Sequence, residues 1–167
     1  MPLQGRAKYA ILHTMTADDE IMAIALEEAR LAAAAGEVPA GCVIVDIPSG
    51  EILARAHNRT ETLHRPTAHA EILAIEEAAR RRGNWRIVDS ALYVTKEPCP
   101  MCAGAIILAR CSRVVWGVAD PKRGGASVFD MFAHPGVNHH PAVQGGVMEK
   151  QCLEVLQTFF KTRRKSK

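Results

Sequence analysis

The sequence lacks the features that mark membrane-spanning and secreted proteins. No uninterrupted apolar run approaches the roughly 18 residues that a membrane-spanning helix needs. Cysteine occurs 5 times, an odd number, and no charged-then-apolar leader opens the chain. Both observations argue against a secreted scaffold held by disulfides. We therefore expect a cytoplasmic protein whose thiols are reduced.

The chain also lacks a strong charge of either sign, because its formal net charge is only +3. A charge of this size does not by itself indicate a nucleic-acid partner. After the last acidic residue, Glu154, the chain carries aromatic residues and cations: Phe159, Phe160, Lys161, Arg163, Arg164, Lys165 and Lys167. Such a segment can bind phosphates and stack bases. On composition alone, however, a solvated helix end with core phenylalanines is favoured.

A length of 167 residues and an apolar content of 48% fit one domain with a sizeable core. Residues 1–15 show no clear periodicity, and we expect them to form a poorly ordered N-terminal extension. Residues 16–167 are expected to form the single domain.

Short apolar segments alternate with helical patterns along this domain. We expect helices at 16–35, at 68–82, from the cysteine motif at 97–102, at 127–132 and at 148–164, and strands at 42–46, 51–56, 91–95, 113–117 and 142–147. The turn residues at 47–50 make the first two strands a hairpin. The pattern predicts an α/β fold of three layers, with a five-stranded mixed sheet covered by helices on both faces.

Two motifs carry the chemistry. They are TAHAE at 67–71 and EPCPMC at 97–102. One imidazole and two thiols are ligands that Zn²⁺ prefers, and a tetrahedral ion with three protein ligands keeps one position for water. The carboxylate of Glu71 can move protons for that water without binding the metal. The motifs therefore predict metal-assisted hydrolysis with one Zn²⁺ bound by His69, Cys99 and Cys102.

Each motif alone is weak evidence, because Cys-x-x-Cys also occurs in redox pairs and structural zinc sites. Their order is more specific, since the chain between Glu71 and Pro98 has room for a helix, a turn and one strand. We expect His69 and Glu71 in the first turn of one helix, and the cysteines at the start of another helix on the same face of the sheet. This order is typical of zinc nucleobase deaminases.

The other noticeable residues have simpler interpretations, with one exception. The exception is Asn58, a polar residue after a strand end, where binding clefts often form. The rest are interpreted as packing cysteines, loop histidines and arginines at a helix end, namely Cys42, Cys111, Cys152, His134, His139, His140 and residues 80–82.

With these residues placed, the chain resembles the bacterial tRNA-specific adenosine deaminases of the cytidine deaminase superfamily over residues 18–164. The resemblance rests on short motifs along the chain: residues 37–39, 58–59, 66–72, 92–95, 97–105, 113–115, 120–122, 138–139 and 159–160. Free-base and cytidine deaminases share the zinc motifs. The asparagine-histidine pair at 138–139 and the aromatic-basic tail are what resemble the tRNA branch.

The resemblance implies a cytidine deaminase-like fold and a homodimer. It implies conversion of adenosine to inosine at the wobble position of a tRNA anticodon, typically of an arginine tRNA, with release of ammonia. In this family's pattern the three predicted ligands bind zinc and Glu71 shuttles protons. The base would be held by Asn58 and the backbone of Ala70, and the anticodon loop by Phe159, Phe160, Arg163 and Arg164.

The sequence leaves two alternatives. The first is a guanine or free-nucleoside deaminase, which the same zinc motifs would fit. The second is a non-catalytic RNA-binding domain with a structural zinc site, in which His64 or another side chain is the fourth ligand. Coordination separates the second alternative from an enzyme, because four protein ligands indicate a structural site and a bound water indicates catalysis.

Overall fold

The computed structural model describes residues 17–165. The predicted N-terminal extension, 1–15, lies outside the described residues. The elements in chain order are α1 (Ala17–Ala34), β1 (Gly41–Asp46), β2 (Ile52–His57), α2 (Thr60–Leu63), α3 (Ala70–Arg82), β3 (Ser90–Lys96), α4 (Pro100–Leu108), β4 (Arg113–Val118), β5 (Ala142–Gln144) and α5 (Glu149–Lys165).

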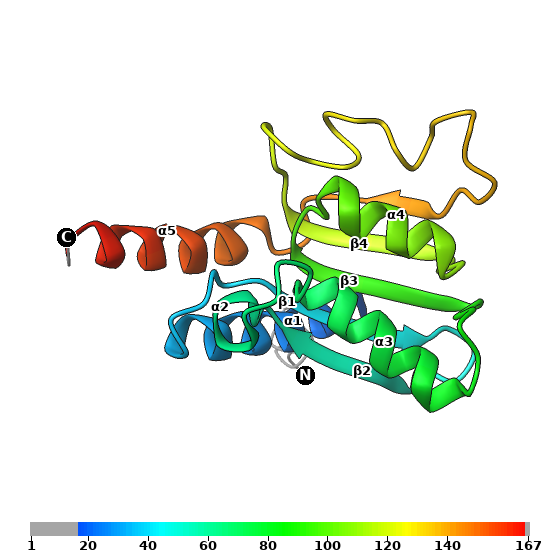
Figure 1. Cartoon of the computed structure of the whole chain (residues 1–167), viewed down its shortest axis with the longest axis horizontal. Coiled ribbons are helices and arrows are strands. Elements are labelled where there is room, and N and C mark those ends of the chain that lie inside the picture. Colours follow the sequence, from blue (N-terminus) through cyan, green and yellow to red (C-terminus); the bar gives the residue numbers. More distant parts are fainter. Residues whose placement is uncertain (1–16, 166–167) are drawn as a thin grey trace, which may run out of the picture.

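The five strands form one mixed sheet in the order β2-β1-β3-β4-β5 (Figure 1). Strand β1 pairs antiparallel with β2 and β3, whereas β3 pairs parallel with β4 and β4 with β5. The inner strands β1, β3 and β4 are buried along most of their length. Strands covered on both faces need nearly continuous apolar sequences, which explains why apolar residues make up most of each of these three strands. The predicted fold class and sheet are confirmed.

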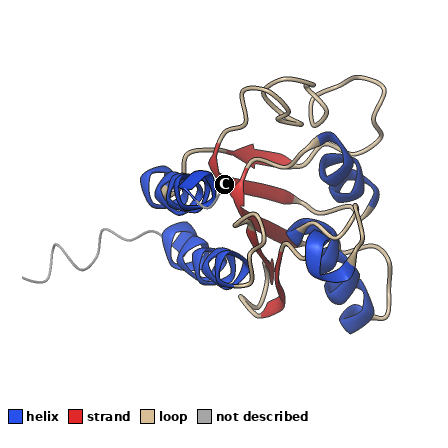
Figure 2. Ribbon diagram, turned by 60° about the vertical axis from the view of Figure 1, so that its left-hand side comes forward, coloured by secondary structure: helices blue, strands red, loops and turns tan. Residues whose placement is uncertain are grey.

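Helices cover both faces of the sheet, as Figure 2 shows edge-on. On one face α3 packs against alternate residues of β1, including Cys42 and Ile44, and α4 packs beside α3 in the same core. On the other face α1 packs against Val43 and Val45 of β1, and α5 packs against β4 and β3 in the same core. Because successive strand side chains point to opposite faces, one strand supplies both cores. The two helices that follow the metal motifs therefore lie on the same face, as predicted.

Alanines bring α1 close to the sheet. Ala25 and Ala29 are fully buried, and a methyl group at Gly41 would overlap the carbonyl oxygen of Ala25. A side chain at position 41 would force the helix away from β1. The helix ends where the sequence predicted, because Gly36 adopts a φ of 77° that favours glycine.

Three local predictions were wrong. His69 lies at the N-cap of α3 and not within its first turn. The helix predicted at 127–132 is a series of turns, because the carboxylate of Glu97 accepts the N–H groups of Ala126 and Ser127 and Asp130 has a positive φ of 49°. The strand predicted at 142–147 ends at Gln144, where the next glycine passes so close to the Trp116 ring that it leaves no room for a Cβ atom.

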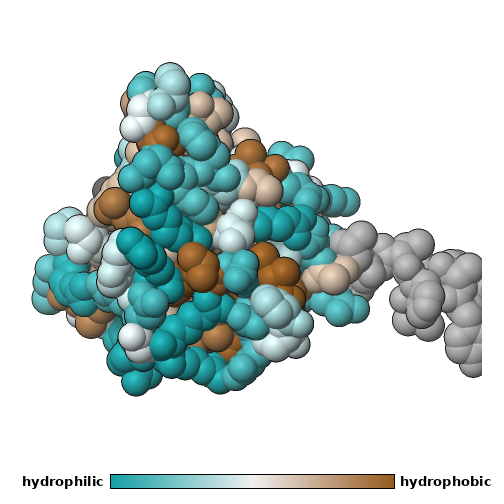
Figure 3. Space-filling view, turned by 90° about the vertical axis from the view of Figure 1, so that its right-hand side faces the viewer, coloured by the Kyte–Doolittle hydropathy of each residue, from teal (hydrophilic) through white to brown (hydrophobic). Residues whose placement is uncertain are grey.

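No helix among residues 17–165 is long and apolar enough to span a membrane. On the face of the molecule shown in Figure 3, hydrophobic residues form separate small patches among hydrophilic ones. A surface of this kind is normal for a globular domain, since isolated apolar side chains are common on protein surfaces.

Candidate metal centre and its pocket

Three ligand-type side chains from two helix starts converge. The Nδ1 atom of His69 lies 3.7 Å from the Sγ atom of Cys99 and 3.5 Å from that of Cys102. All three ligand atoms lie within 4.8 Å of one another. Tetrahedral zinc with ordinary Zn–S and Zn–N bonds would hold sulfur and nitrogen about 3.5 Å apart. The donor set and its spacing therefore fit Zn²⁺.

The backbone at both helix starts directs these side chains inward. His69 and Cys99 are the N-cap residues of α3 and α4, and both are extended, with ψ of 154° and 170°. Neither side chain makes the usual capping hydrogen bond to its own helix. Both side chains are therefore free to approach each other, and Cys102 in the first turn of α4 completes the group.

The cysteine pair contains one readily ionised thiol. Hydrogen bonds from Cys102 and His69 lower the pKa of Cys99 to about 4, against the opposing effect of burial. The hydrogen bond to Cys99, together with burial, raises the pKa of Cys102 above its ordinary range. The hydrogen bond with Cys99 also raises the pKa of His69, more than burial lowers it. The lowered pKa of Cys99 favours the thiolate, the form that binds metal.

Glu71 lies in the first turn of α3, beside the three ligand-type residues. Its side chain is buried and lines the same pocket as His69 and Cys99. Desolvation by burial raises the pKa of Glu71 above its ordinary value. A buried carboxyl group whose pKa is raised towards neutrality is suited to accept and return a proton.

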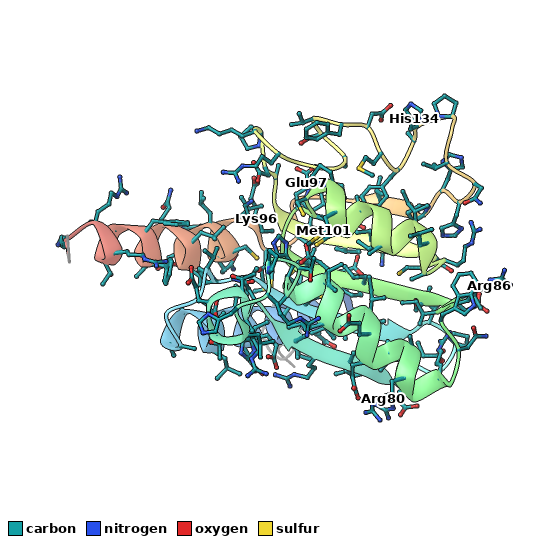
Figure 4. The ribbon with its side chains drawn as sticks, in the orientation of Figure 1. Arg80, Arg86, Lys96, Glu97, Met101 and His134 are labelled. Carbon is teal, nitrogen blue, oxygen red and sulfur yellow. The ribbon has the colours of Figure 1, made fainter. Side chains whose placement is uncertain are left out.

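A cavity of about 470 Å³ opens beside this group. It is lined by residues from several elements: Val38, Ala40, Asn58, Thr60, His69, Ala70, Glu71, Lys96, Glu97, Cys99, Asp120, Lys122, Arg123, Leu156 and Phe160. A cavity of this volume is in the range of sites for small ligands. Figure 4 shows Lys96 and Glu97 at the end of β3 that lies near α5, far from Arg80 and Arg86.

The structure brings some of the predicted substrate-binding residues to this cavity and not others. Asn58, Ala70 and Phe160 line it. Phe159 lines a separate cavity of about 490 Å³ between α1 and α5. The guanidinium carbon of Arg163 lies 5.6 Å from the centre of the Phe159 ring, and Arg164 donates to the carbonyl oxygen of Phe160.

The loop after β4 contributes cationic residues that sequence reasoning left without a role. Lys122 and Arg123 line the cavity. Glu97 holds this loop in place, since its carboxylate accepts the N–H groups of Asp120 and Ser127 at 2.8 and 2.7 Å. The Asp-Pro-Lys sequence at 120–122 was part of the family resemblance and is the signal that could have identified these residues.

The residues interpreted as structural are buried or paired. Cys42, Cys111 and Cys152 are buried. Arg82 pairs with Asp46, and Arg81 with Glu51. Each loop histidine bonds to nearby backbone, and no second group of metal-ligating residues forms among residues 17–165.

Comparison with known proteins agrees with this geometry. A model of the cytidine and deoxycytidylate deaminase zinc-binding region matches residues 15–118. The tRNA-specific adenosine deaminase of Bacillus subtilis (strain 168) is 47% identical over 154 residues, which cover 92% of this chain and 94% of that protein. This chain belongs to the tRNA-specific adenosine deaminase family.

Other members of this deaminase family and their structural neighbours extend the comparison. The tRNA-specific adenosine deaminase of Haemophilus influenzae is 43% identical over 151 residues, which cover 90% of this chain and 87% of that protein. A solved structure from a study of A-to-I editing by tRNA:A34 deaminases superposes with a TM-score of 0.79 and 43% identity over 82% of this chain and 99% of that one. The structure of a guanine deaminase from Nitrosomonas europaea superposes with a TM-score of 0.71 and 21% identity over 87% of this chain and 85% of that one. At this identity the similarity shows a shared fold only.

Proposed function

We propose that this protein is a zinc-dependent hydrolase that deaminates adenosine to inosine at the wobble position of a tRNA anticodon. The observation that carries the proposal is the convergence of His69, Cys99 and Cys102 beside the buried carboxyl group of Glu71. Zinc, when bound, supplies a Lewis acid that lowers the pKa of water towards about 7. The reaction consumes one water molecule and releases ammonia.

Glu71 is the residue that moves protons in this mechanism. It accepts a proton from the attacking water and delivers one to N1 of adenine as oxygen adds to C6. It then takes the second proton from the hydroxyl group now on C6 and gives it to the amino group, so that C6=O forms as the C6–N bond breaks and ammonia leaves. Its burial supports this role, because the raised pKa lets the carboxyl group carry a proton and release it in turn.

The remaining residues hold the substrate. Asn58 and the backbone of Ala70 hold the base inside the cavity, and both line it. The anticodon loop is held by the C-terminal residues Phe159, Phe160, Arg163 and Arg164. Splaying the base out of its loop costs a few kcal/mol, which stacking and phosphate contacts can offset.

The structural-zinc alternative needs a fourth protein ligand. His64 is exposed, and the group of metal-ligating residues found in the described part of the chain contains only His69, Cys99 and Cys102. A position for water is what a catalytic site requires. This favours the enzyme over an RNA-binding domain.

We further propose that the enzyme works as a cytoplasmic homodimer with an arginine tRNA as its substrate. The decisive experiment incubates the zinc-loaded protein with a wobble-adenosine anticodon stem-loop, with free guanine and with cytidine, and measures inosine and ammonia. We expect inosine from the stem-loop only. Turnover of guanine or cytidine without turnover of the RNA would replace the proposal with a free-base or nucleoside deaminase.

A further inference from the structure

Asn58 has an unusual hydrogen-bonding state for a buried side chain. It follows β2, is only 6% exposed and lines the cavity together with His69 and Glu71. Its Oδ1 atom has no hydrogen-bond partner, and no other buried side-chain nitrogen or oxygen in residues 17–165 shares this state. Because leaving a buried acceptor unpaired costs free energy, such an atom calls for an explanation by function.

The environment of Asn58 fixes the orientation of its amide. Its Nδ2 atom lies 3.3 Å from the carbonyl oxygen of Val38 and 3.4 Å from Oε2 of Glu37. A carbonyl oxygen and an ionised carboxylate can only accept hydrogen bonds. The nitrogen must therefore face these two groups, and the flipped amide would place its oxygen against two acceptors. Oδ1 is left as an acceptor without a donor.

Glu37 is itself held in place. It is fully buried, and its carboxylate accepts the N–H groups of Thr62 at 2.7 Å and Glu61 at 3.2 Å and the hydroxyl of Thr60 at 3.4 Å. These bonds tie it to the first turn of α2. Burial raises the pKa of Glu37, but the hydrogen bonds outweigh burial and the pKa lies below its ordinary value. The carboxylate is ionised at neutral pH and cannot rotate away from Asn58 without losing these bonds.

We propose that Glu37 is a positioning residue that fixes the Asn58 amide so that Oδ1 accepts a hydrogen bond from a donor group of the bound nucleotide. This inference rests on the proposed function. Within an RNA chain, an adenosine residue has two donors, the 6-amino group of the base and the 2′-hydroxyl of the ribose, whereas its ring nitrogens only accept. Oδ1 of Asn58 therefore recognises a hydrogen-bond donor of the bound nucleotide. Glu37 contributes to this recognition by holding the Asn58 amide in the orientation that leaves Oδ1 unpaired.

A double-mutant cycle tests whether Glu37 acts through Asn58. Asn58→Ala removes the acceptor and should lower kcat/KM for the stem-loop about tenfold. Glu37→Gln is nearly isosteric, but its amide NH2 group can donate a hydrogen bond to Oδ1 of Asn58. The Asn58 amide can then flip and no longer offers a free acceptor, so kcat/KM should fall by a similar factor. In the Asn58→Ala background, Glu37→Gln should cause no further loss. Losses that simply add would show that Glu37 has only a structural role and would overturn the proposal.

Two substrates identify the donor. The Asn58→Ala penalty is measured on the stem-loop with adenosine and with 2′-deoxyadenosine at the wobble position. A penalty that disappears on the deoxy substrate assigns the bond to the 2′-hydroxyl, and a penalty that persists assigns it to the amino group. No penalty on either substrate would overturn the proposal, and this comparison holds even if Glu37→Gln does not fold.

Binding measurements separate this inference from the proposed function. Stem-loop affinity is measured in the zinc-loaded Glu71→Ala protein, with and without Asn58→Ala, so that the substrate is not consumed. We expect about tenfold weaker binding without the asparagine side chain. If wild-type protein forms no inosine, the proposed function fails. If affinity is unchanged by Asn58→Ala, the inference fails, whatever the activity of the wild-type protein.

Discussion

The Nδ1 atom of His69 lies 3.5 Å from the Sγ atom of Cys102, although 33 positions separate the two residues in the sequence. Strands β2 and β3 both pair antiparallel with β1 and therefore run in the same direction, so α3 and α4, which follow them and pack side by side, begin at the same edge of the sheet. His69 and Cys99 are the extended N-cap residues of these helices, and Cys102 lies in the first turn of α4. The fold thus builds a three-ligand group from rigid elements, which fixes its geometry.

Glu71→Gln tests proton transfer. The substitution keeps the size and shape of the side chain but removes its ability to accept a proton. We expect zinc content and thermal unfolding like those of the wild type, and inosine formation lower by at least about a hundredfold, the usual contribution of a general acid–base group. Metal analysis and a stem-loop assay measure both effects. Turnover within about tenfold of the wild type would contradict the role of Glu71.

Phe160→Ala and Phe159→Ala form a matched pair for RNA binding. Phe160 is 44% exposed and lines the cavity, whereas Phe159 lines the separate cavity between α1 and α5. Stacking of a base on an aromatic ring contributes about 1–3 kcal/mol. We expect Phe160→Ala to raise KM for the stem-loop at least about fivefold, and more than Phe159→Ala does. Equal effects of the two changes on KM would show that the tail does not stack a base at the cavity.

Gly124→Ala tests the anchoring of the loop by Glu97. A methyl group at this position would overlap the Glu97 carboxylate, which four hydrogen bonds to the loop hold in place. We expect a loss of about 2 kcal/mol in the free energy of unfolding and weaker stem-loop binding, because the loop carries Lys122 and Arg123 to the cavity.

Gly104→Ala is the control for Gly124→Ala. Gly104 lies in α4, where an added Cβ atom would meet nothing closer than 3.9 Å. Alanine is favoured over glycine in a helix by about 1 kcal/mol, so this variant should be as stable as the wild type or more stable. If both variants have the same stability, the loop does not depend on Glu97.

Asp18→Asn tests an ion pair that ties α1 to the sheet. Arg113 donates to both carboxylate oxygens of Asp18, at 2.7 and 2.8 Å, and Tyr93 donates to one of them at 2.7 Å. The hydrogen bond from Arg113 holds the pKa of Asp18 below its ordinary value despite partial burial. The resulting stability is fully present above the unfolded pKa of about 3.9 and is lost as pH falls through the lower folded pKa.

We therefore expect Asp18→Asn to cost about 1–2 kcal/mol at pH 7 and the difference from the wild type to shrink below about pH 3. Urea unfolding at several pH values measures the cost. Glu20→Gln changes an exposed carboxylate in the same turn of α1 and is the control. A cost that stays constant from pH 7 to pH 2 would show that the charge of Asp18 is not responsible.

The sequence alone was sufficient for the sheet, the covering helices and the three ligand-type residues. Those features have local causes, since apolar runs predict strands, and Gly36 and Gly83 end helices at positive φ. The motifs at 67–71 and 97–102 also contain ligand types that few other sites combine. Long, well-capped elements were therefore predicted within a few residues.

The features that the sequence did not reveal depend on buried carboxylates that bond to distant backbone. Glu37 accepts the N–H group of Thr62, 25 positions away, and so stabilises α2, which was not predicted. Glu97 accepts the N–H group of Ser127, 30 positions away, and holds turns where a helix was expected. No local pattern marks such a pairing, and a buried glutamate cannot be distinguished from an exposed one in a single sequence.

Zinc K-edge X-ray absorption of the purified, zinc-loaded protein tests the central claim most directly. The account predicts one Zn²⁺ per chain bound by two sulfurs at about 2.3 Å, one imidazole nitrogen and one oxygen that is not from the protein. Cys99→Ser and Cys102→Ser should each remove one sulfur from the spectrum. A fourth protein donor, or a zinc ion without both sulfurs, would contradict the assignment of this group as a catalytic metal site.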